Sequence, residues 1–134
     1  MSTNIIKMMS LNNKNIGEIG EGLACRFLIK KRYKILFRNY REKFDEIDII
    51  AKSFDRTLVF VEVKTLEAGE YKTLIPEDNL TKDKFKKISR ICRIFAGFHK
   101  ELIDERIGWR IDLIAITLQK DGSSEINHYE NIAM

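Results

Sequence analysis

Two short apolar segments, residues 46–52 and 57–65, restrict the possible folds of this chain more than any other feature. Both segments are rich in Ile and Val, which is typical of β-strands. The link between them, Ser53-Phe54-Asp55-Arg56, is short enough for a hairpin. We therefore expect these two segments to be adjacent strands of one sheet.

Charged residues interrupt both of these strands. Because side chains alternate between the faces of a strand, Glu62 and Lys64 share one face and continue an apolar row, where a charge is costly unless it is paired or bound to a metal. If the hairpin loop is 54–56, Asp48 lies opposite Glu62 with its Cβ atom about 5 Å away. A slip of one residue would move Asp48 to the other face.

Two such carboxylates repel each other, which raises the pKa of one of them unless a cation lies between them. Their hard oxygen atoms suit Mg²⁺ or Mn²⁺, and Lys64 could hold an attacking water or a phosphate. This arrangement predicts metal-assisted hydrolysis of a phosphodiester. The alternative is structural: Glu62 pairs with Lys64, and Asp48 accepts backbone hydrogen bonds. The E-x-K pattern is common by chance, so the spacing alone leaves both interpretations open.

The other segments complete an α/β pattern in the order α-β-β-β-α-β. Helical apolar spacing predicts helices over 15–32 and 81–103, and Glu21 lies at the border of the apolar stripe in the first. Alternation predicts a strand over 33–39, with Tyr33, Ile35 and Phe37 on one side. Further strands are expected at 109–118 and 125–130, and a loop at 66–80. A central mixed sheet with helices packed on it is the economical arrangement.

The length of 134 residues fits one domain, which we expect at 15–134 after a flexible N-terminal arm, 1–14. Two cysteines and two histidines are too few and too widely spaced for a disulfide framework or a zinc site. Reduced thiols favour a cytoplasmic protein. No apolar stretch approaches the roughly 20 residues of a membrane span, and no secretory signal is apparent.

Charge is distributed unevenly around a net value of +4. Segments 26–43 and 81–100 are strongly basic and flank an acidic segment, 44–80. Basic flanks around an acidic centre suit a phosphate-binding surface beside a metal site, although solvated helix faces would give the same pattern. The candidates for phosphate contact are Arg38, Arg41, Lys82 and Lys84. Of the remaining polar residues, we expect Asp112 to pair with Arg110 and His99 to pack within its helix, while the role of His128 is open.

Several motifs together resemble the YraN-like family of predicted endonucleases, part of the PD-(D/E)XK nuclease superfamily and akin to archaeal Holliday-junction resolvases. Together they cover about residues 13–133. The motifs are Gly17-Glu18-Ile19-Gly20-Glu21 with Ala24, Arg38-Asn39-Tyr40-Arg41, Glu46-Ile47-Asp48, Val59-Phe60-Val61-Glu62-Val63-Lys64-Thr65, Thr81 to Lys84, Arg110-Ile111-Asp112, and Ile126-Asn127-His128 with Asn131-Ile132-Ala133.

The resemblance implies a restriction-endonuclease-like domain that cuts DNA, branched DNA among the candidates, with Mg²⁺ or Mn²⁺. It makes Asp48 and Glu62 the metal ligands, Lys64 the catalytic lysine and Glu21 an additional acid. A homodimer is an option, because enzymes that cut both strands of a junction often dimerise. Two positions depart from the family pattern: Asp45 replaces a glycine and Leu66 replaces an arginine. The alternatives are a nuclease-like protein that binds nucleic acid without cutting it, and a purely structural protein.

Overall fold

The structure is a computed structural model that describes residues 13–43, 45–68 and 81–133. Two α-helices, one short 3₁₀-helix and five strands account for most of these residues. In chain order they are α2 (Asn13–Lys30), β1 (Lys34–Glu42), β2 (Asp45–Lys52), β3 (Leu58–Glu67), α4 (Lys82–Phe98), η1 (Lys100–Leu102), β4 (Trp109–Leu118) and β5 (Ser124–Tyr129).

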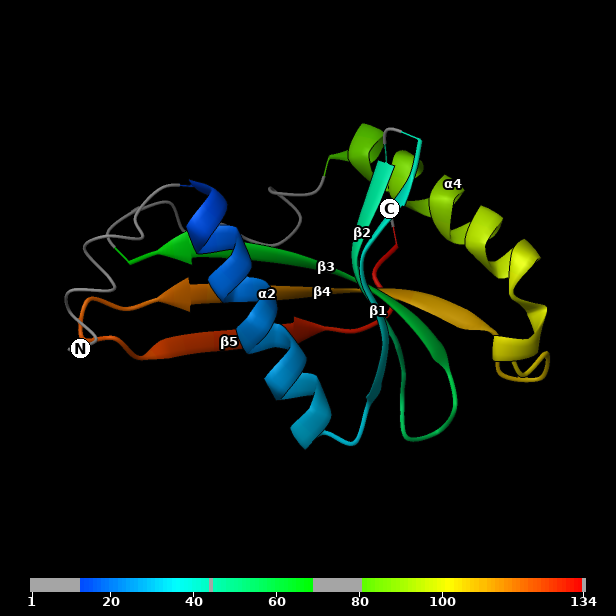
Figure 1. Ribbon diagram of the computed structural model, residues 1–134, viewed down its shortest axis with the longest axis horizontal. Helices are drawn as coiled ribbons and strands as arrows, with labels where there is room; N and C mark the ends of the chain where they lie inside the picture. The colour runs from blue at the N-terminus through cyan, green and yellow to red at the C-terminus, as the bar shows by residue number, and fades with distance from the viewer. Residues whose placement is uncertain (1–12, 44, 69–80, 134) are drawn as a thin grey trace.

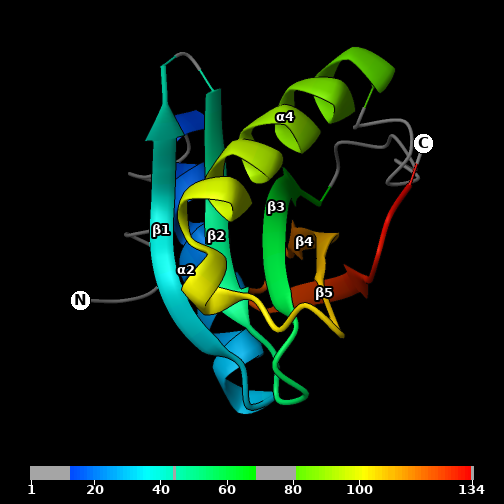
Figure 2. The ribbon, with the colours of Figure 1, turned by 90° about the vertical axis from the view of Figure 1, so that its right-hand side faces the viewer.

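The strands form one sheet in the order β1-β2-β3-β4-β5. Neighbours are antiparallel except β3 and β4, which are parallel and therefore need the long crossover that contains α4. Helix α2 covers one face of the sheet and α4 the other (Figures 1 and 2). The predicted α/β domain with a mixed sheet between helices is therefore confirmed.

Each helix closes its own apolar core against the sheet. The α2 core contains Ala24, Leu28, Ile49, Val59, Val61, Ile114 and Ile116. The α4 core contains Ile50, Leu58, Phe60, Ile91, Cys92 and Phe95. Residues of β2 and β3 thus pack against both helices, which explains why both strands are nearly continuous apolar runs in the sequence.

The β2–β3 hairpin has the predicted register. The Ser53 N–H donates to the Thr57 carbonyl over 2.9 Å, so residues 54–56 form the loop. The ladder then runs as far as the pair Ile49 and Val61. Beyond that pair β3 continues beside β4 while β2 turns away toward β1 (Figure 1). We call this opening in the sheet, between Asp48 of β2 and Glu62 of β3, the fork.

Strand β1 differs from the simple alternation expected of it. A bulge between Ile35 and Phe37 adds one residue to β1 relative to β2. Ile35 packs in the α2 core, whereas the Phe37 ring contacts Phe95 of α4 at 5.6 Å between centroids. The prediction that Phe37 shares a face with Tyr33 and Ile35 was therefore wrong, because a bulge reverses the alternation beyond it.

Several boundaries also differ from the predictions: β1 ends at Glu42 instead of residue 39, and β3 ends at Glu67 instead of residue 65. Helix α4 ends at Phe98, with His99 as its C-cap, and a 3₁₀ turn replaces the rest of the expected helix to residue 103. Helix α2 begins at Asn13, two residues earlier than expected. The expected arm, 1–14, lies outside the described residues up to position 12. The expected loop, 66–80, lies outside them from position 69, and its predicted start at residue 66 was wrong because β3 continues to Glu67. No helix in the described ranges is long and apolar enough to span a bilayer.

Candidate metal centre and nucleic-acid interface

The two acidic side chains that the sequence places opposite each other lie at the fork. The pairing of Ile49 with Val61 puts Asp48 next to Glu62 in the following row. Asp48 Oδ2 accepts a hydrogen bond of 2.8 Å from the Val63 N–H. A side-chain carboxyl group of β2 thus replaces the backbone as the acceptor for β3 where the ladder between the two strands ends. The Glu62 side chain is only 11% exposed. The fork therefore holds two largely buried carboxyl groups on adjacent strands.

Burial and proximity to Glu62 together raise the pKa of Asp48. Burial, followed by a hydrogen bond to Glu62 and the charge of Glu62, raises the pKa of Asp48 to about 8. The Val63 N–H and the charge of Lys84 act in the opposite direction but are outweighed. The pair therefore retains a proton at neutral pH in the metal-free protein, as expected of two carboxyl groups that share one site.

The first turn of α4 brings Lys84 to this pair. Thr81 caps the helix, and its Oγ1 accepts a hydrogen bond of 3.2 Å from the Lys84 N–H. Lys84 Nζ then lies 3.5 Å from Glu62 Oε2. Arg90, further along α4, forms an ion pair of 2.7 Å with Asp45 at the start of β2. The sequence left open whether Lys84 reaches the site, and the structure places it there.

Glu21 approaches the same site from α2. It is half-buried, and its pKa is raised first by burial and then by the negative charges of Asp48 and Glu46. A hydrogen bond with Asn39 and the charge of Arg38 partly offset this increase. Glu21 is thus within electrostatic range of Asp48, as the resemblance implies for an additional acid.

The close approach of α2 to β3 places Glu21 there. A Cβ atom at Gly20 would overlap the Thr65 hydroxyl oxygen and would lie 2.8 Å from Thr65 Cβ. Only a glycine lets the helix backbone approach the strand this closely. Gly20 therefore determines the distance between Glu21 and the fork.

Lys64 occupies the position expected from its spacing. It lies on β3 two residues beyond Glu62, and strand alternation directs both side chains to the same face. Among the described residues Glu62 forms its ion pair with Lys84 and none with Lys64. The Glu62–Lys64 pair of the structural interpretation is therefore not what neutralises Glu62 in this part of the chain.

The acid pair fits a divalent metal ion. Asp48 and Glu62 supply hard carboxylate oxygens, and burial together with the charge of Glu62 raises the pKa of Asp48, an effect that a bound cation would offset. No third Asp, Glu, His or Cys completes a cluster with them within residues 13–43, 45–68 and 81–133. Mg²⁺ is often held by only one or two carboxylates, with water and substrate phosphate as its other ligands. Asp48 and Glu62 are thus the residues that would hold the ion.

Beside the acid pair, α4 presents a row of cations to solvent. Lys82, Lys86, Arg90 and Arg93 are exposed and follow helical spacing, so they lie on the face opposite the apolar stripe. Lys82, Lys86 and Arg93 form no ion pair with the described residues. We call these four residues the α4 basic row. It suits a phosphate backbone, although a solvated helix face would have the same pattern.

The two other predicted phosphate contacts lie on the edge strand β1. Arg38 is exposed, while Arg41 forms an ion pair of 3.4 Å with Glu46 of β2. In the pairing of β1 with β2, Arg38 is opposite Ile49 and Arg41 is opposite Glu46, the two residues on either side of Ile47 and Asp48. The structure thus places Arg38 and Arg41 on a different element from Lys82 and Lys84.

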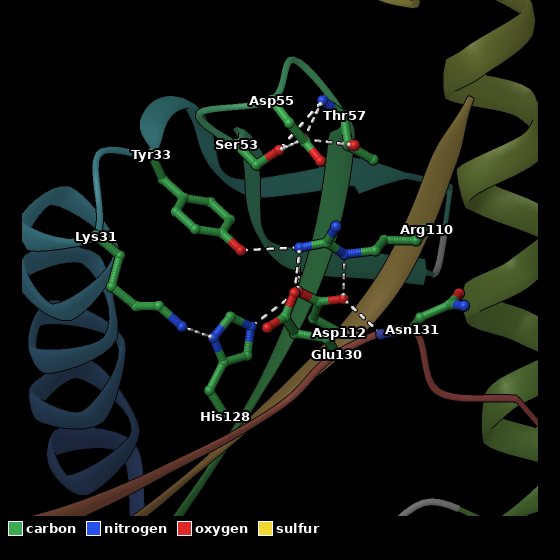
Figure 3. A network of polar contacts seen from close by, with 10 residues as sticks. All are labelled: Lys31, Tyr33, Ser53, Asp55, Thr57, Arg110, Asp112, His128, Glu130 and Asn131. Atoms are coloured by element: carbon green, nitrogen blue, oxygen red, sulfur yellow. Dashed lines mark hydrogen bonds and ion pairs between the residues drawn. The ribbon is translucent and has the colours of Figure 1, made fainter. Parts of the chain in front are cut away.

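A second polar cluster surrounds Asp112 on β4 (Figure 3). Arg110 Nε donates to Asp112 Oδ1 over 3.0 Å, which confirms the predicted ion pair. His128 Nε2 lies 2.8 Å from Asp112 Oδ2, and the Asn131 N–H donates to Asp112 Oδ1. Burial alone would raise the pKa of Asp112, but these hydrogen bonds outweigh it and hold the pKa below its ordinary value.

This cluster joins the link between α2 and β1 to strands β4 and β5. Arg110 Nη2 donates to the Tyr33 hydroxyl over 2.8 Å. Lys31 Nζ lies 3.0 Å from His128 Nδ1. Because an ammonium can only donate, Nδ1 accepts and the imidazole proton is on Nε2, where it donates to Asp112. Asp112, which is fully buried, is therefore a structural anchor, separate from the carboxylates of the fork.

Comparison with known proteins gives a family for this arrangement. The sequence profile of the uncharacterised protein family UPF0102 matches residues 20–116, which include the fork, Lys64, Lys84 and Asp112. The chain belongs to this family. A UPF0102 protein of Alkaliphilus oremlandii is 42% identical over 124 residues, which cover 89% of this chain and 97% of the relative. UPF0102 proteins of Geobacter metallireducens and Caldicellulosiruptor bescii are 39% and 37% identical over 92% and 87% of this chain, and over 95% of each relative.

Three contacts in these clusters of the UPF0102 chain were not predicted from the sequence. Each contact joins residues far apart in the chain: Arg90 with Asp45, Tyr33 with Arg110, and Lys31 with His128. No local spacing signals such contacts. The pairing of His128 with Asp112 resolves the role that the sequence left open, and His99 packs on the Phe95 ring as expected.

The shared proton of the fork predicts that the UPF0102 chain loses stability as pH rises. In the unfolded chain Asp48 ionises near pH 3.8, but in the folded metal-free protein its raised pKa keeps the proton bound up to about pH 8. The metal-free protein therefore loses stability between these two values. Asp48→Asn keeps an oxygen for the Val63 N–H but carries no charge. We expect it to increase the free energy of unfolding by about 2 kcal/mol at pH 8.5, since one pKa unit is worth about 1.4 kcal/mol.

Denaturant unfolding with a chelator present, at pH 4 and pH 8.5, checks this prediction. The advantage of Asp48→Asn should nearly vanish at pH 4, where the wild-type carboxyl group is protonated. Glu46→Gln, which neutralises a more exposed carboxylate on the same strand, is the matched control. An advantage of Asp48→Asn over the wild type that is no larger at pH 8.5 than at pH 4 would show that folding does not raise the pKa of Asp48.

Proposed function

We propose that this protein is a metal-dependent nuclease that hydrolyses DNA phosphodiester bonds. One observation carries the proposal: two largely buried carboxyl groups, Asp48 and Glu62, meet at the fork, and Lys64 lies two residues beyond Glu62 on the same face of β3. The PD-(D/E)XK resemblance gives the same three residues the same roles. Membership of UPF0102 is consistent with the proposed nuclease function but does not assign an activity, since that family is described as uncharacterised.

In this proposal Asp48 and Glu62 hold the divalent ion. When bound, such an ion polarises the phosphate and lowers the pKa of a coordinated water. Lys64 donates hydrogen bonds to the attacking water or to a non-bridging phosphate oxygen, which orients them and offsets developing charge. Glu21 contributes a further carboxylate from the opposite helix. The water oxygen bonds to phosphorus and releases one proton, one phosphorus–oxygen ester bond breaks, and the departing sugar oxygen takes up one proton, so that water is added across the broken bond.

The substrate in this proposal is a nucleic acid held by its backbone. The α4 basic row lies on the helix that also carries Lys84 to Glu62. Contacts to phosphate oxygens position a nucleic acid without reading its sequence. Substrate shape should therefore matter more than base sequence, and branched DNA is a candidate.

A second candidate function is a module that binds nucleic acid without cutting it. The observation that favours this alternative is the α4 basic row, whose exposed cations need no metal ion to attract phosphate. Retention of the acid pair and Lys64 favours the nuclease over this alternative.

A cleavage panel distinguishes the two functions. Labelled DNA of one sequence is supplied as a four-way junction, a flap, a single strand and a plain duplex, with Mg²⁺, Mn²⁺ or a chelator. The nuclease predicts cleavage of at least one substrate that stops when the chelator is added. Gel shifts without cleavage under any metal condition would favour the binding module.

A further inference from the structure

The ion pair between Lys84 and Glu62 joins side chains of very different accessibility. Lys84 is 51% exposed, whereas Glu62 is 11% exposed. Cap hydrogen bonding by Thr81 fixes the backbone at Lys84, but the long side chain beyond it extends along the protein surface. The ammonium can therefore leave Glu62 without any change in the core.

The charge balance at the fork differs between the metal-free and the metal-bound protein. A largely buried carboxylate needs compensation, and Lys84 is the cation that pairs with Glu62 among the described residues. A divalent cation supplies two positive charges, which are enough for two ionised carboxylates. Lys84 would then be a surplus positive charge a few ångströms from that cation and would be repelled.

We propose that Lys84 is the resident counter-ion of the acid pair, which a divalent cation displaces and which then becomes free to bind a phosphate of the nucleic acid. The second half of this inference rests on the proposed function, whereas the first half requires only that the fork binds a metal ion. Loading of the metal and binding of the nucleic acid are then positively coupled, and the coupling is reciprocal.

Metal titration without nucleic acid tests the first half. Lys84→Gln should bind Mn²⁺ about fivefold more tightly than the wild type in calorimetry, because no cation has to be displaced. Lys84→Arg keeps the charge and should behave like the wild type. Lys86→Gln removes an exposed charge from the α4 basic row and should change the affinity less than about twofold. Unchanged or weaker Mn²⁺ binding by Lys84→Gln would overturn the inference.

Nucleic-acid binding with and without a cation tests the second half. Ca²⁺, another hard cation that binds carboxylate oxygen, serves as the probe ion, with labelled DNA measured by fluorescence anisotropy. The affinity of the wild type for DNA should rise with Ca²⁺. The Ca²⁺-dependent increase in affinity should be at least about threefold smaller for Lys84→Gln. Lys86→Gln should weaken binding equally with and without Ca²⁺. An equal Ca²⁺-dependent increase in wild type and Lys84→Gln would overturn this half.

These outcomes separate the inference from the proposed function. Tighter Mn²⁺ binding by Lys84→Gln supports the counter-ion role even if no DNA is cleaved. Failure of the wild type to bind any nucleic acid would overturn both the proposed function and the second half of the inference. Thermal melting of all three variants confirms that a changed affinity does not reflect a changed fold.

Discussion

Lys64→Ala should lower the rate of DNA cleavage about 100-fold while leaving metal affinity within about threefold of the wild type. Lys64 lies on the same face of β3 as Glu62, and its proposed role is to hold the water or the phosphate rather than the metal. Removing one preorganised donor from a transition state typically costs a factor of about 100 to 1000 in rate. Single-turnover cleavage together with Mn²⁺ calorimetry measures the two effects separately.

Lys52→Ala is a matched control for this prediction. Lys52 lies at the hairpin end of β2, away from the fork, and pairs with Leu58 in the ladder. Its removal should change the cleavage rate less than about twofold. If Lys64→Ala and Lys52→Ala both cleave at the wild-type rate, Lys64 has no catalytic role. If Lys64→Ala loses metal binding as well, Lys64 supports the acid pair rather than the reacting groups.

Gly20→Ala should destabilise the protein by about 3 kcal/mol. The added Cβ would overlap the Thr65 hydroxyl oxygen and would lie 2.9 Å from Thr65 Cγ2, so either α2 or β3 has to shift. Overpacking of this kind typically costs about 1–3 kcal/mol, and here the obstacle includes atoms close to the strand backbone. Chemical denaturation measures the loss directly. Because Glu21 is the next residue, the shift should also move its carboxylate away from the fork.

Two further variants give this prediction a control and a rescue. Gly22 lies in the same helix with nothing within 4 Å of an added Cβ, so Gly22→Ala should stabilise the protein by about 0.5–1 kcal/mol through helix propensity. Thr65→Ala removes two of the three obstructing atoms and should recover part of the loss in the double variant. Equal effects of Gly20→Ala and Gly22→Ala would show that α2 does not approach β3 as closely as described.

The centre of the fold could be predicted because its signals are local. The short link Ser53–Arg56 restricts the hairpin to a few registers, and the register with a 54–56 loop, which the structure has, puts Asp48 beside Glu62. Helical spacing likewise located the apolar stripe of α4, the helix that Thr81 caps. Each of these features depends on residues within a few positions of one another, where periodicity and turn length are informative.

Contacts between distant elements could not be predicted in the same way. The bulge at Ile35–Phe37 has no glycine or proline to mark it, and it moved Phe37 to the α4 face. The hydrogen bond from Arg110 to Tyr33 spans 77 positions. Whether Glu62 pairs with Lys64 or Lys84 depends on where α4 docks, which the spacing of charges along β3 does not specify.

The most direct test of the account is cleavage of the preferred DNA substrate by Glu62→Gln at the same Mg²⁺ concentration as the wild type. Glutamine keeps the size of the side chain and one oxygen but lacks the charge that would hold the ion. Our account predicts that Glu62→Gln binds Mn²⁺ at least about tenfold more weakly and cleaves at least about 100-fold more slowly. Cleavage by Glu62→Gln within about threefold of the wild-type rate would contradict a metal-dependent site at the fork.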